Sequence, residues 1–326
     1  MKKKVYSGIR ATNRLHIGNY LGAVKGMLAL QDQYDCIFSV VDLHAMTTPY
    51  DPETLQMSVR NIILDYLAAG LDPEKCALEI QSQVPQHTEL SFLLSTMYPV
   101  SRLEDLPTYK DKKLQHPKYI NMGLLYYPVL MAADVLLYKG ELVPVGIDQE
   151  PHLEVMREIA RKFNSVYGDT FPEPQRFKTV GEYVPSLTGS GKMSKSVDGS
   201  YITLADDLDA IRRRIAKVPT DSGSLGGNIP QTGGVANLFT LLKLFGPKET
   251  FITYVEQYRE KTIRYSDMKD VVATLIHEEL LPLQNKRREL EQQPELVDRI
   301  IAEGREKCLI RAEATMNEVK QKMGLL

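Results

Sequence analysis

Residues 5–20, with the sequence VYSGIRATNRLHIGNY, place a short apolar strand before a glycine turn and the start of a helix. The strand, Val5 to Ile9, is rich in residues that favour a pleated backbone. After the turn at residues 10–14, Gly18 to Gln33 carries its apolar residues on one side of a helix, and Asp35 to Val41 is a second apolar, β-branched run. This strand–helix–strand order predicts an α/β fold.

The same alternation continues along the chain. Pro52 to Ala69 is helical and closes at Gly70, and Ala77 to Ile80 is a third strand. Several of these strands are continuous apolar runs, which is typical of parallel strands covered on both faces. The sequence therefore predicts an α/β protein with a doubly wound, parallel sheet of the Rossmann type, whose ligands bind at the carboxyl ends of the strands.

Residues 85–115 interrupt the alternation and predict an inserted pair of helices, within a helical insertion at about 85–120. The sheet pattern then returns, because Leu142 to Val145 is a short strand between two helices. The first of these helices is the apolar stretch from Gly123 to Tyr138. The second starts at Pro151, a residue suited to the first helical turn, and reaches about Phe163.

The C-terminal part of the chain has a different character. Residues 221–234 contain five glycines and predict a hinge. The helical stretches that follow are Val235–Phe245, Thr250–Tyr258, Met268–Gln292 and Pro294–Met323. We therefore expect a catalytic domain at 1–200 and, at 201–326, a hinge with an α-helical domain whose last helix is able to pack back on the catalytic domain.

Charge sets a limit on nucleic-acid binding. The chain of 326 residues has a formal net charge of −2, so an RNA partner must be held by local basic clusters. The candidate clusters are Arg212–Arg214, Lys286–Arg288, and Lys110 with Lys112 and Lys113. Each cluster is either an RNA contact or a solvated helix face.

The three cysteines, Cys36, Cys76 and Cys308, are far apart and form no CxxC pair. They predict reduced core thiols, with no protein-bound metal and no iron–sulfur cluster. The stretch after the N-terminal lysines is too short for a signal peptide, and no run of residues is long and apolar enough to span a membrane. These features predict a cytoplasmic protein that has no membrane partner.

Two motifs carry the chemistry of phosphate binding. His16-Ile17-Gly18-Asn19 lies at a strand-to-helix turn, where free N–H groups and a glycine let a phosphate approach the backbone. An ordinary turn with a surface histidine is the alternative. Lys192-Met193-Ser194-Lys195-Ser196 places two cations on a glycine-flanked loop, where they can stabilise the charge of a departing pyrophosphate.

Asp134 is a carboxylate within an apolar helix, so a donor must satisfy it if it is buried. Tyr127, Met131 and Asp134 share one face of that helix. A ligand with a single N–H, such as indole, can supply the donor while Met131 packs on its ring. A core tyrosine hydroxyl or a water molecule is the alternative donor. Such a site rejects phenylalanine, whereas excluding tyrosine also requires the right pocket size.

The two phosphate motifs resemble the HIGH and KMSKS signatures of class I aminoacyl-tRNA synthetases. Nearly the whole chain is similar to the bacterial tryptophanyl-tRNA synthetase family. Besides the KMSKS loop, this resemblance rests on Tyr6-Ser7-Gly8-Ile9, Val41-Asp42-Leu43-His44-Ala45, Leu130-Met131-Ala132-Ala133-Asp134, Val143-Pro144-Val145-Gly146-Ile147-Asp148-Gln149 and Pro219-Thr220-Asp221-Ser222.

The resemblance implies a set of site residues. The residues expected to bind ATP are Arg10, Ala11, Thr12, Gly18, Asn19, Gly146, Ile147, Asp148, Val184, Lys192, Met193, Ser194, Lys195 and Ser196. Those expected to bind tryptophan are Asp134, Met131, Tyr127, Gln149, Tyr6, Gly8 and His44. The expected catalytic residues, which stabilise phosphate charge, are His16, Lys192 and Lys195.

The resemblance also implies a reaction. Tryptophan and ATP, with Mg²⁺, give tryptophanyl-adenylate, and the tryptophanyl group then passes to tRNA(Trp); the family implies a homodimer whose helical domain reads the anticodon. The alternatives are a tyrosyl-tRNA synthetase, a nucleotidyltransferase of the same superfamily that uses no RNA, and a non-catalytic RNA-binding or regulatory paralogue.

Overall fold

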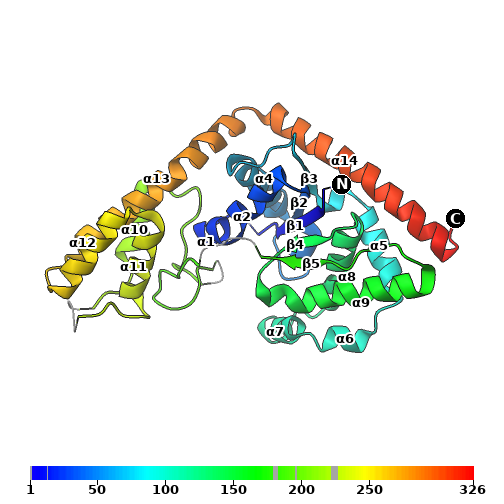
Figure 1. Ribbon diagram of the computed structural model, residues 1–326, viewed down its shortest axis with the longest axis horizontal. Coiled ribbons are helices and arrows are strands. Elements are labelled where there is room, and N and C mark those ends of the chain that lie inside the picture. The colour runs from blue at the N-terminus through cyan, green and yellow to red at the C-terminus, as the bar shows by residue number, and fades with distance from the viewer. Residues whose placement is uncertain (1, 13, 179–182, 195–196, 222–226) are drawn as a thin grey trace. The chain divides into compact units, whose positions relative to one another are not determined.

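The computed structural model describes residues 2–12, 14–178, 183–194, 197–221 and 227–326 (Figure 1). Its sheet has five strands in the order β3-β2-β1-β4-β5, and every paired strand is parallel. The strands are β1 (Lys4–Arg10), β2 (Asp35–Val41), β3 (Cys76–Ile80), β4 (Leu142–Pro144) and β5 (Gln175–Phe177). The predicted doubly wound sheet is confirmed, and its strand order reverses between β1 and β4, where such folds bind ligands.

Local capping explains where the main helices of this sheet begin. Helix α4 (Pro52–Ala68) starts after Asp51, whose side chain accepts a hydrogen bond from the Glu53 N–H, and Pro52 fills the first helical position. Helix α8 (Met122–Leu136) is capped in the same way by Asn121, which accepts from the Leu124 N–H. Helix α9 (Glu150–Tyr167) carries Pro151 in its first turn, as predicted.

The helix expected at residues 18–33 is helical but not uniform. The segments are α1 (Ile17–Asn19), a π-helical turn at Tyr20–Val24, α2 (Lys25–Leu28) and a 3₁₀ turn at Ala29–Asp32. A short helix α3 (Asp42–Ala45) follows β2 and was not predicted.

The insertion contains three helices, so the predicted pair is wrong by one. They are α5 (Gln86–Ser95), α6 (Val100–Glu104) and α7 (Pro107–Gln115). Pro99 caps the start of α6, and Pro107 occupies the first turn of α7. Because proline begins a helix far more readily than it continues one, the two prolines divide the segment into short pieces.

The described residues form two compact units. The first comprises the described parts of 1–13, 27–179 and 293–326, and the second comprises those of 14–26 and 180–292. The second unit contains α10 (Leu208–Ala216), α11 (Gly234–Phe245), α12 (Lys248–Arg259) and α13 (Tyr265–Glu291). The last helix, α14 (Pro294–Met323), belongs to the first unit and contacts β3. The functional boundary at residue 200 stays a prediction.

The core of the first unit lies between the sheet and its helices. Side chains of α5, α8, α9 and α14 join those of the strands in one buried cluster. Cys36, Cys76 and Cys308 are all buried and free, so the prediction of reduced core thiols is confirmed. Burial raises the pKa of the Cys36 and Cys76 thiols to about 12, which keeps them protonated and unreactive.

Gly304 lets α14 approach β3 closely. A Cβ atom at this position would lie 1.9 Å from the carbonyl oxygen of Leu78. Gly304→Ala is therefore expected to lower the free energy of unfolding by about 3 kcal/mol, because helix and strand must move apart, although alanine favours helices. Urea unfolding measures the change. Glu303→Ala, on the exposed side of the same turn, is the control, and equal stability of both variants would contradict this account of the packing.

Candidate active site

A cavity of about 260 Å³ opens in the first unit at the carboxyl end of β1, beside the point where the strand order reverses. Strands β1 and β4, helices α3, α7 and α8, and the start of α9 contribute its walls. The polar or charged lining residues include Tyr6, Arg10, His44, Thr48, Thr108, Lys112, Tyr127, Asp134, Gln149 and His152. The apolar part of the wall includes Met131, Val143 and Val145.

The structure brings together every residue that the sequence assigned to tryptophan. These residues are Tyr6, Gly8, His44, Tyr127, Met131, Asp134 and Gln149, and all of them line the cavity. Tyr127, Met131 and Asp134 do so from one face of α8, as their spacing predicted. At Gly8 a Cβ atom would lie 2.7 Å from a methyl group of Val41, so a larger residue there disturbs the wall.

The residues assigned to ATP belong to both units. Within the first unit, Arg10 lines the cavity, whereas Ala11 and Thr12 line a neighbouring cavity of about 290 Å³. Gly146, Ile147 and Asp148 follow β4, outside the described lining of both cavities. Ile147 is 75 % exposed there, which leaves this turn accessible to a ligand.

His16 lies in the second unit, where it caps the short helix α1. Its Nδ1 accepts a hydrogen bond from the Asn19 N–H at 3.2 Å, and Asn19 Oδ1 accepts from the His16 N–H at 3.4 Å. His16 is only 4 % exposed and packs near the ring of Tyr201. The alternative of a surface histidine is therefore wrong, because this side chain is buried in the turn that it organises.

The KMSKS segment also lies in the second unit. Met193 is buried, and its N–H donates to the carbonyl oxygen of Val184 at 3.0 Å. Lys192 forms a β-bridge with Pro185, and its side chain is exposed. Val184 is fully buried. Ser194 is half-buried, and its N–H donates to Ser200 Oγ at 3.3 Å, whereas Lys195 and Ser196 lie outside the described residues.

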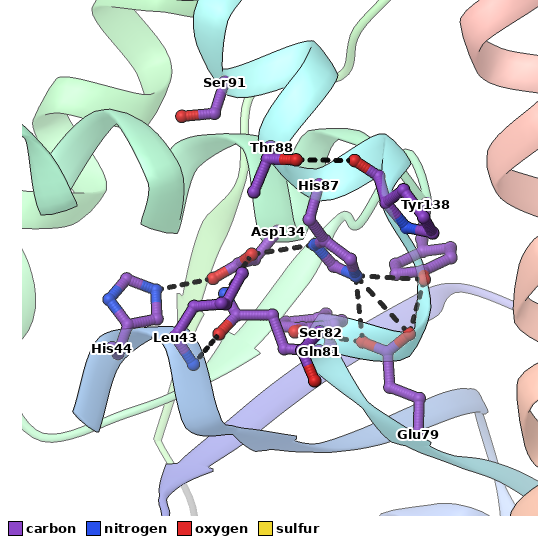
Figure 2. Close-up of polar contacts among 12 residues, drawn as sticks. Leu43, His44, Glu79, Gln81, Ser82, His87, Thr88, Ser91, Asp134 and Tyr138 are labelled. Carbon is purple, nitrogen blue, oxygen red and sulfur yellow. Dashed lines mark hydrogen bonds and ion pairs between the residues drawn. The ribbon is translucent and has the colours of Figure 1, made fainter. Parts of the chain in front are cut away.

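Asp134 is 2 % exposed and accepts hydrogen bonds from side chains of three elements (Figure 2). Its Oδ1 atom accepts from Gln81 Nε2 at 2.8 Å and from His87 Nδ1 at 2.7 Å. Its Oδ2 atom lies 2.8 Å from His44 Nε2. The protein itself therefore satisfies the buried carboxylate. The observed donors are two histidines and a glutamine rather than a core tyrosine hydroxyl. Because a carboxylate oxygen has two acceptor positions, one position on Oδ2 remains beside the contact with His44.

A second buried carboxylate, Glu79 on β3, lies on the other side of His87. His87 Nε2 is 3.2 Å from Glu79 Oε1. Two tyrosine hydroxyls also donate to Glu79, that of Tyr138 at 2.5 Å and that of Tyr6 at 3.2 Å. Glu79, Gln81 and His87 are functional candidates that sequence reasoning missed. Their signal in the sequence was weak, because it consisted only of a charged residue within the apolar third strand and of polar residues among those that follow the strand.

The contacts of this network set the protonation states. Burial opposes ionisation of Asp134, but His44 and His87 outweigh it and hold the pKa of this carboxyl well below its usual range. Burial likewise opposes ionisation of Glu79, yet His87 and Tyr138 lower its pKa. For His87, burial favours the neutral ring, and the two carboxylates reverse this effect and raise its pKa to about 10. At neutral pH, Asp134 and Glu79 are therefore ionised and His87 is protonated.

The raised pKa of His87 predicts a pH dependence of stability. Its ordinary pKa of 6.5 rises to about 10 in the folded protein, so its stabilising charge is fully effective below 6.5 and is lost as the pH rises toward 10. The loss of unfolding free energy caused by His87→Gln should therefore be largest below pH 6.5 and become smaller up to pH 10. Urea unfolding of both proteins across this range measures the difference. A constant difference would contradict the assigned charge.

Cationic and hydroxyl groups line another part of the cavity. The Tyr127 hydroxyl lies 2.9 Å from Thr108 Oγ1 and 2.8 Å from His152 Nε2. Arg10 donates to Thr48 Oγ1 at 2.9 Å, and burial lowers the pKa of its guanidinium. Burial and the nearby Arg10 lower the pKa of Lys112. Because an anion would relieve this repulsion, Arg10 and Lys112 are candidate ligands for a carboxylate or phosphate.

The basic clusters have carboxylate partners. In the second unit, Arg212 pairs with Asp270 at 2.6 Å and Arg214 with Asp206 at 2.7 Å. Arg287 likewise pairs with Glu291 at 2.9 Å, and in the first unit Lys110 pairs with Asp105 at 3.1 Å. These contacts favour the helix-face interpretation for Lys110, Arg212, Arg214 and Arg287, whereas Lys112 lines the cavity.

Among the described residues, no group of three or more His, Cys, Asp or Glu side chains could hold a metal ion. Within the same residues, no helix is both long and apolar enough to cross a membrane.

Comparison with known proteins gives a consistent result. The family model described as class I tRNA synthetases (W and Y) matches residues 1–281. The chain is 39 % identical to a tryptophan–tRNA ligase of Porphyromonas gingivalis over 98 % of each chain. It is 40 % identical to that of Caldanaerobacter subterraneus over 99 % of each. A crystal structure of tryptophanyl-tRNA synthetase from Campylobacter jejuni, complexed with ADP and tryptophan, matches 99 % of this chain and 100 % of that one, with a TM-score of 0.89 and 31 % identity.

Proposed function

The chain belongs to the class I tRNA synthetases of the tryptophan and tyrosine family and has the function of a tryptophan–tRNA ligase, and we propose that it activates tryptophan in the cavity beside Asp134. In the first step the tryptophan carboxylate attacks the α-phosphorus of ATP, and the bond to pyrophosphate breaks. The tryptophanyl group of the resulting adenylate then passes to the 3′-terminal adenosine of tRNA(Trp), and AMP leaves.

The single observation that supports this site best is the placement of Asp134. It lies on α8 and lines a cavity whose wall also includes the apolar side chains of Met131, Val143 and Val145, and one acceptor position remains on Oδ2. An indole ring offers one N–H donor and a broad apolar face, so it matches both properties. Met131 packs against the ring in this arrangement, and Gln149 with Tyr127 meets the amino group.

The chemistry requires positioning and charge stabilisation, because the substrate itself supplies the nucleophile. We assign Arg10 and Lys112 to the carboxylate or the α-phosphate, since both cations face the cavity. His16, Lys192 and Lys195 stabilise the phosphate charge that develops as pyrophosphate leaves. ATP binds with Mg²⁺, and Gly18, Asn19 and residues 146–148 contact the nucleotide.

The remaining assignments rest on the family. The chain works in the cytoplasm as a homodimer, with residues 1–200 as the catalytic domain and the helices after the hinge as readers of the tRNA(Trp) anticodon through unstacked bases. Phe92, Val100 and Met122, which are 68 %, 57 % and 70 % exposed, supply apolar surface on the insertion and α8 for a subunit contact. Sedimentation of the purified protein measures the oligomeric state.

Amino-acid-dependent ATP–pyrophosphate exchange across all twenty substrates tests the proposal. Tryptophan alone should support exchange, and the purified enzyme should then charge tRNA(Trp). Exchange with tyrosine instead would establish the tyrosine enzyme of the family. Exchange with tryptophan but no charging would favour the superfamily member that acts without RNA, and no exchange at all would contradict catalysis.

A further inference from the structure

His87 is enclosed by two carboxylates that come from different elements. It lies on α5, with Asp134 of α8 at 2.7 Å from Nδ1 and Glu79 of β3 at 3.2 Å from Nε2 (Figure 2). The Tyr138 hydroxyl is also 3.2 Å from Nε2. The ring, Glu79 and Asp134 are all buried. Because a neutral imidazole has only one N–H, this geometry fits a ring that donates from both nitrogens.

We propose that His87 is a positioning residue for tryptophan recognition. Its ring donates to Asp134 Oδ1, so that only Oδ2 is available to the ring N–H of the substrate. The inference rests on the proposed function of the cavity. His87 is separated from the substrate by the carboxylate that it holds, and it does not line the cavity.

The arrangement of donors around Asp134 explains how positioning takes place. Gln81 and His87 both donate to Oδ1, and only His44 lies on Oδ2. Rotation of the carboxylate about its bond to Cβ would break the contacts on both oxygens, so the donors fix its plane. The remaining acceptor position then points in one direction, which is the condition for strong selection by a single hydrogen bond.

Gln81 links this carboxylate to the segment that carries His44. Its Nε2 donates to Asp134, and its Oε1 accepts from the backbone N–H of Leu43 at 3.1 Å. Asp42 completes the link, because its Oδ1 accepts from the N–H groups of Leu43 and Ser82 at 3.0 Å each. Both sides of Asp134 are therefore held to one framework, and His87 is the member that joins it to Glu79.

The network also bears on the choice between tryptophan and tyrosine. An indole N–H only donates, so it is fully satisfied by the acceptor on Oδ2. A phenol donates too, but its oxygen also accepts, and the three donors around Asp134 are already engaged by the carboxylate. A buried phenol oxygen would thus lack a donor within this network, which is unfavourable.

Asparagine and glutamine at position 87 form a matched pair that separates the two ring nitrogens. The amide nitrogen of asparagine is as many bonds from Cα as Nδ1, so His87→Asn keeps a donor for Asp134. The amide nitrogen of glutamine corresponds to Nε2, so His87→Gln keeps a donor for Glu79 and loses the one for Asp134. If His87 positions Asp134, asparagine should preserve the selectivity for tryptophan. If His87 only holds Glu79, glutamine should preserve it instead.

The readout is the ratio of kcat/KM for tryptophan to that for β-(3-benzothienyl)alanine, in which sulfur replaces the ring N–H. This ratio is independent of the fraction of enzyme that is folded. Glutamine should lower the ratio by roughly tenfold to a hundredfold, whereas asparagine should keep it within about threefold of the unsubstituted enzyme. KM for ATP should change little in either variant.

If His87→Asn or His87→Gln does not fold, the same kcat/KM ratios are measured with each replacement combined with Glu79→Gln. With glutamine at position 79, replacing His87 by asparagine or glutamine no longer leaves an unpaired buried carboxylate at that position. The Glu79→Gln single variant is the reference for both double variants. The same order of asparagine and glutamine supports the proposal, and equal ratios or the reverse order overturn it. Absence of tryptophan-dependent exchange in the unsubstituted enzyme would instead contradict the proposed function, so the two failures are distinguishable.

Discussion

Asp134→Ala is expected to lower kcat/KM for tryptophan in ATP–pyrophosphate exchange by about a thousandfold or more. The variant removes the acceptor proposed for the indole N–H, and it leaves the donors of His44, Gln81 and His87 without their shared partner. Most of the loss should appear as weaker tryptophan binding. The chain contains no tryptophan, so the fluorescence of the bound ligand can be followed without an indole background from the protein.

Two comparisons make this test specific. KM for ATP should stay nearly unchanged in the variant, and Asp105→Ala, which removes an exposed carboxylate from the same unit, should behave as the unsubstituted enzyme. Normal tryptophan affinity in Asp134→Ala would show that the ring binds elsewhere.

Lys192→Ala is expected to lower kcat for adenylate formation by roughly 10²- to 10³-fold, with little effect on tryptophan binding. The exposed ammonium group of Lys192 is proposed to stabilise charge only as pyrophosphate departs, and such an interaction affects the rate more than the affinity. Single-turnover formation of tryptophanyl-adenylate measures the rate, and ligand fluorescence measures the affinity.

Lys217→Ala, another exposed lysine of the second unit, is the matched control and should retain full activity. A rise in KM for ATP with unchanged kcat would mean that Lys192 binds the ground state equally well, contrary to the assigned role.

The sheet could be predicted from the sequence because its central strands are short, mostly apolar stretches separated by helical ones. β1, β2 and β3 all appear within a residue of their predicted bounds. β5 is only three residues long, with a charged centre at Arg176, and so offered no pattern to detect. Helix α10 was not predicted, because three consecutive arginines, Arg212 to Arg214, separate its apolar residues Ile211 and Ile215 in the sequence. These two isoleucines form the buried side of the helix.

The candidate site was predictable where side chains share one element. Tyr127, Met131 and Asp134 follow one another on a helix, and their spacing alone places them on the same face. The partners of Asp134 come from separate elements, and no local pattern links Gln81 or His87 to it. The general rule that a buried carboxylate needs donors was correct, but only the tertiary structure reveals that the protein supplies them.

The first unit is discontinuous in sequence, and this has a consequence for biosynthesis. Its final helix, α14, places Gly304 against Leu78 and Cys308 beside Glu79, so it covers the strand from which the buried network begins. A ribosome makes these residues after all the other parts of the first unit. A nascent polypeptide therefore cannot cover this side of β3 until α14 has been made, and a product terminated before residue 294 lacks the covering helix altogether.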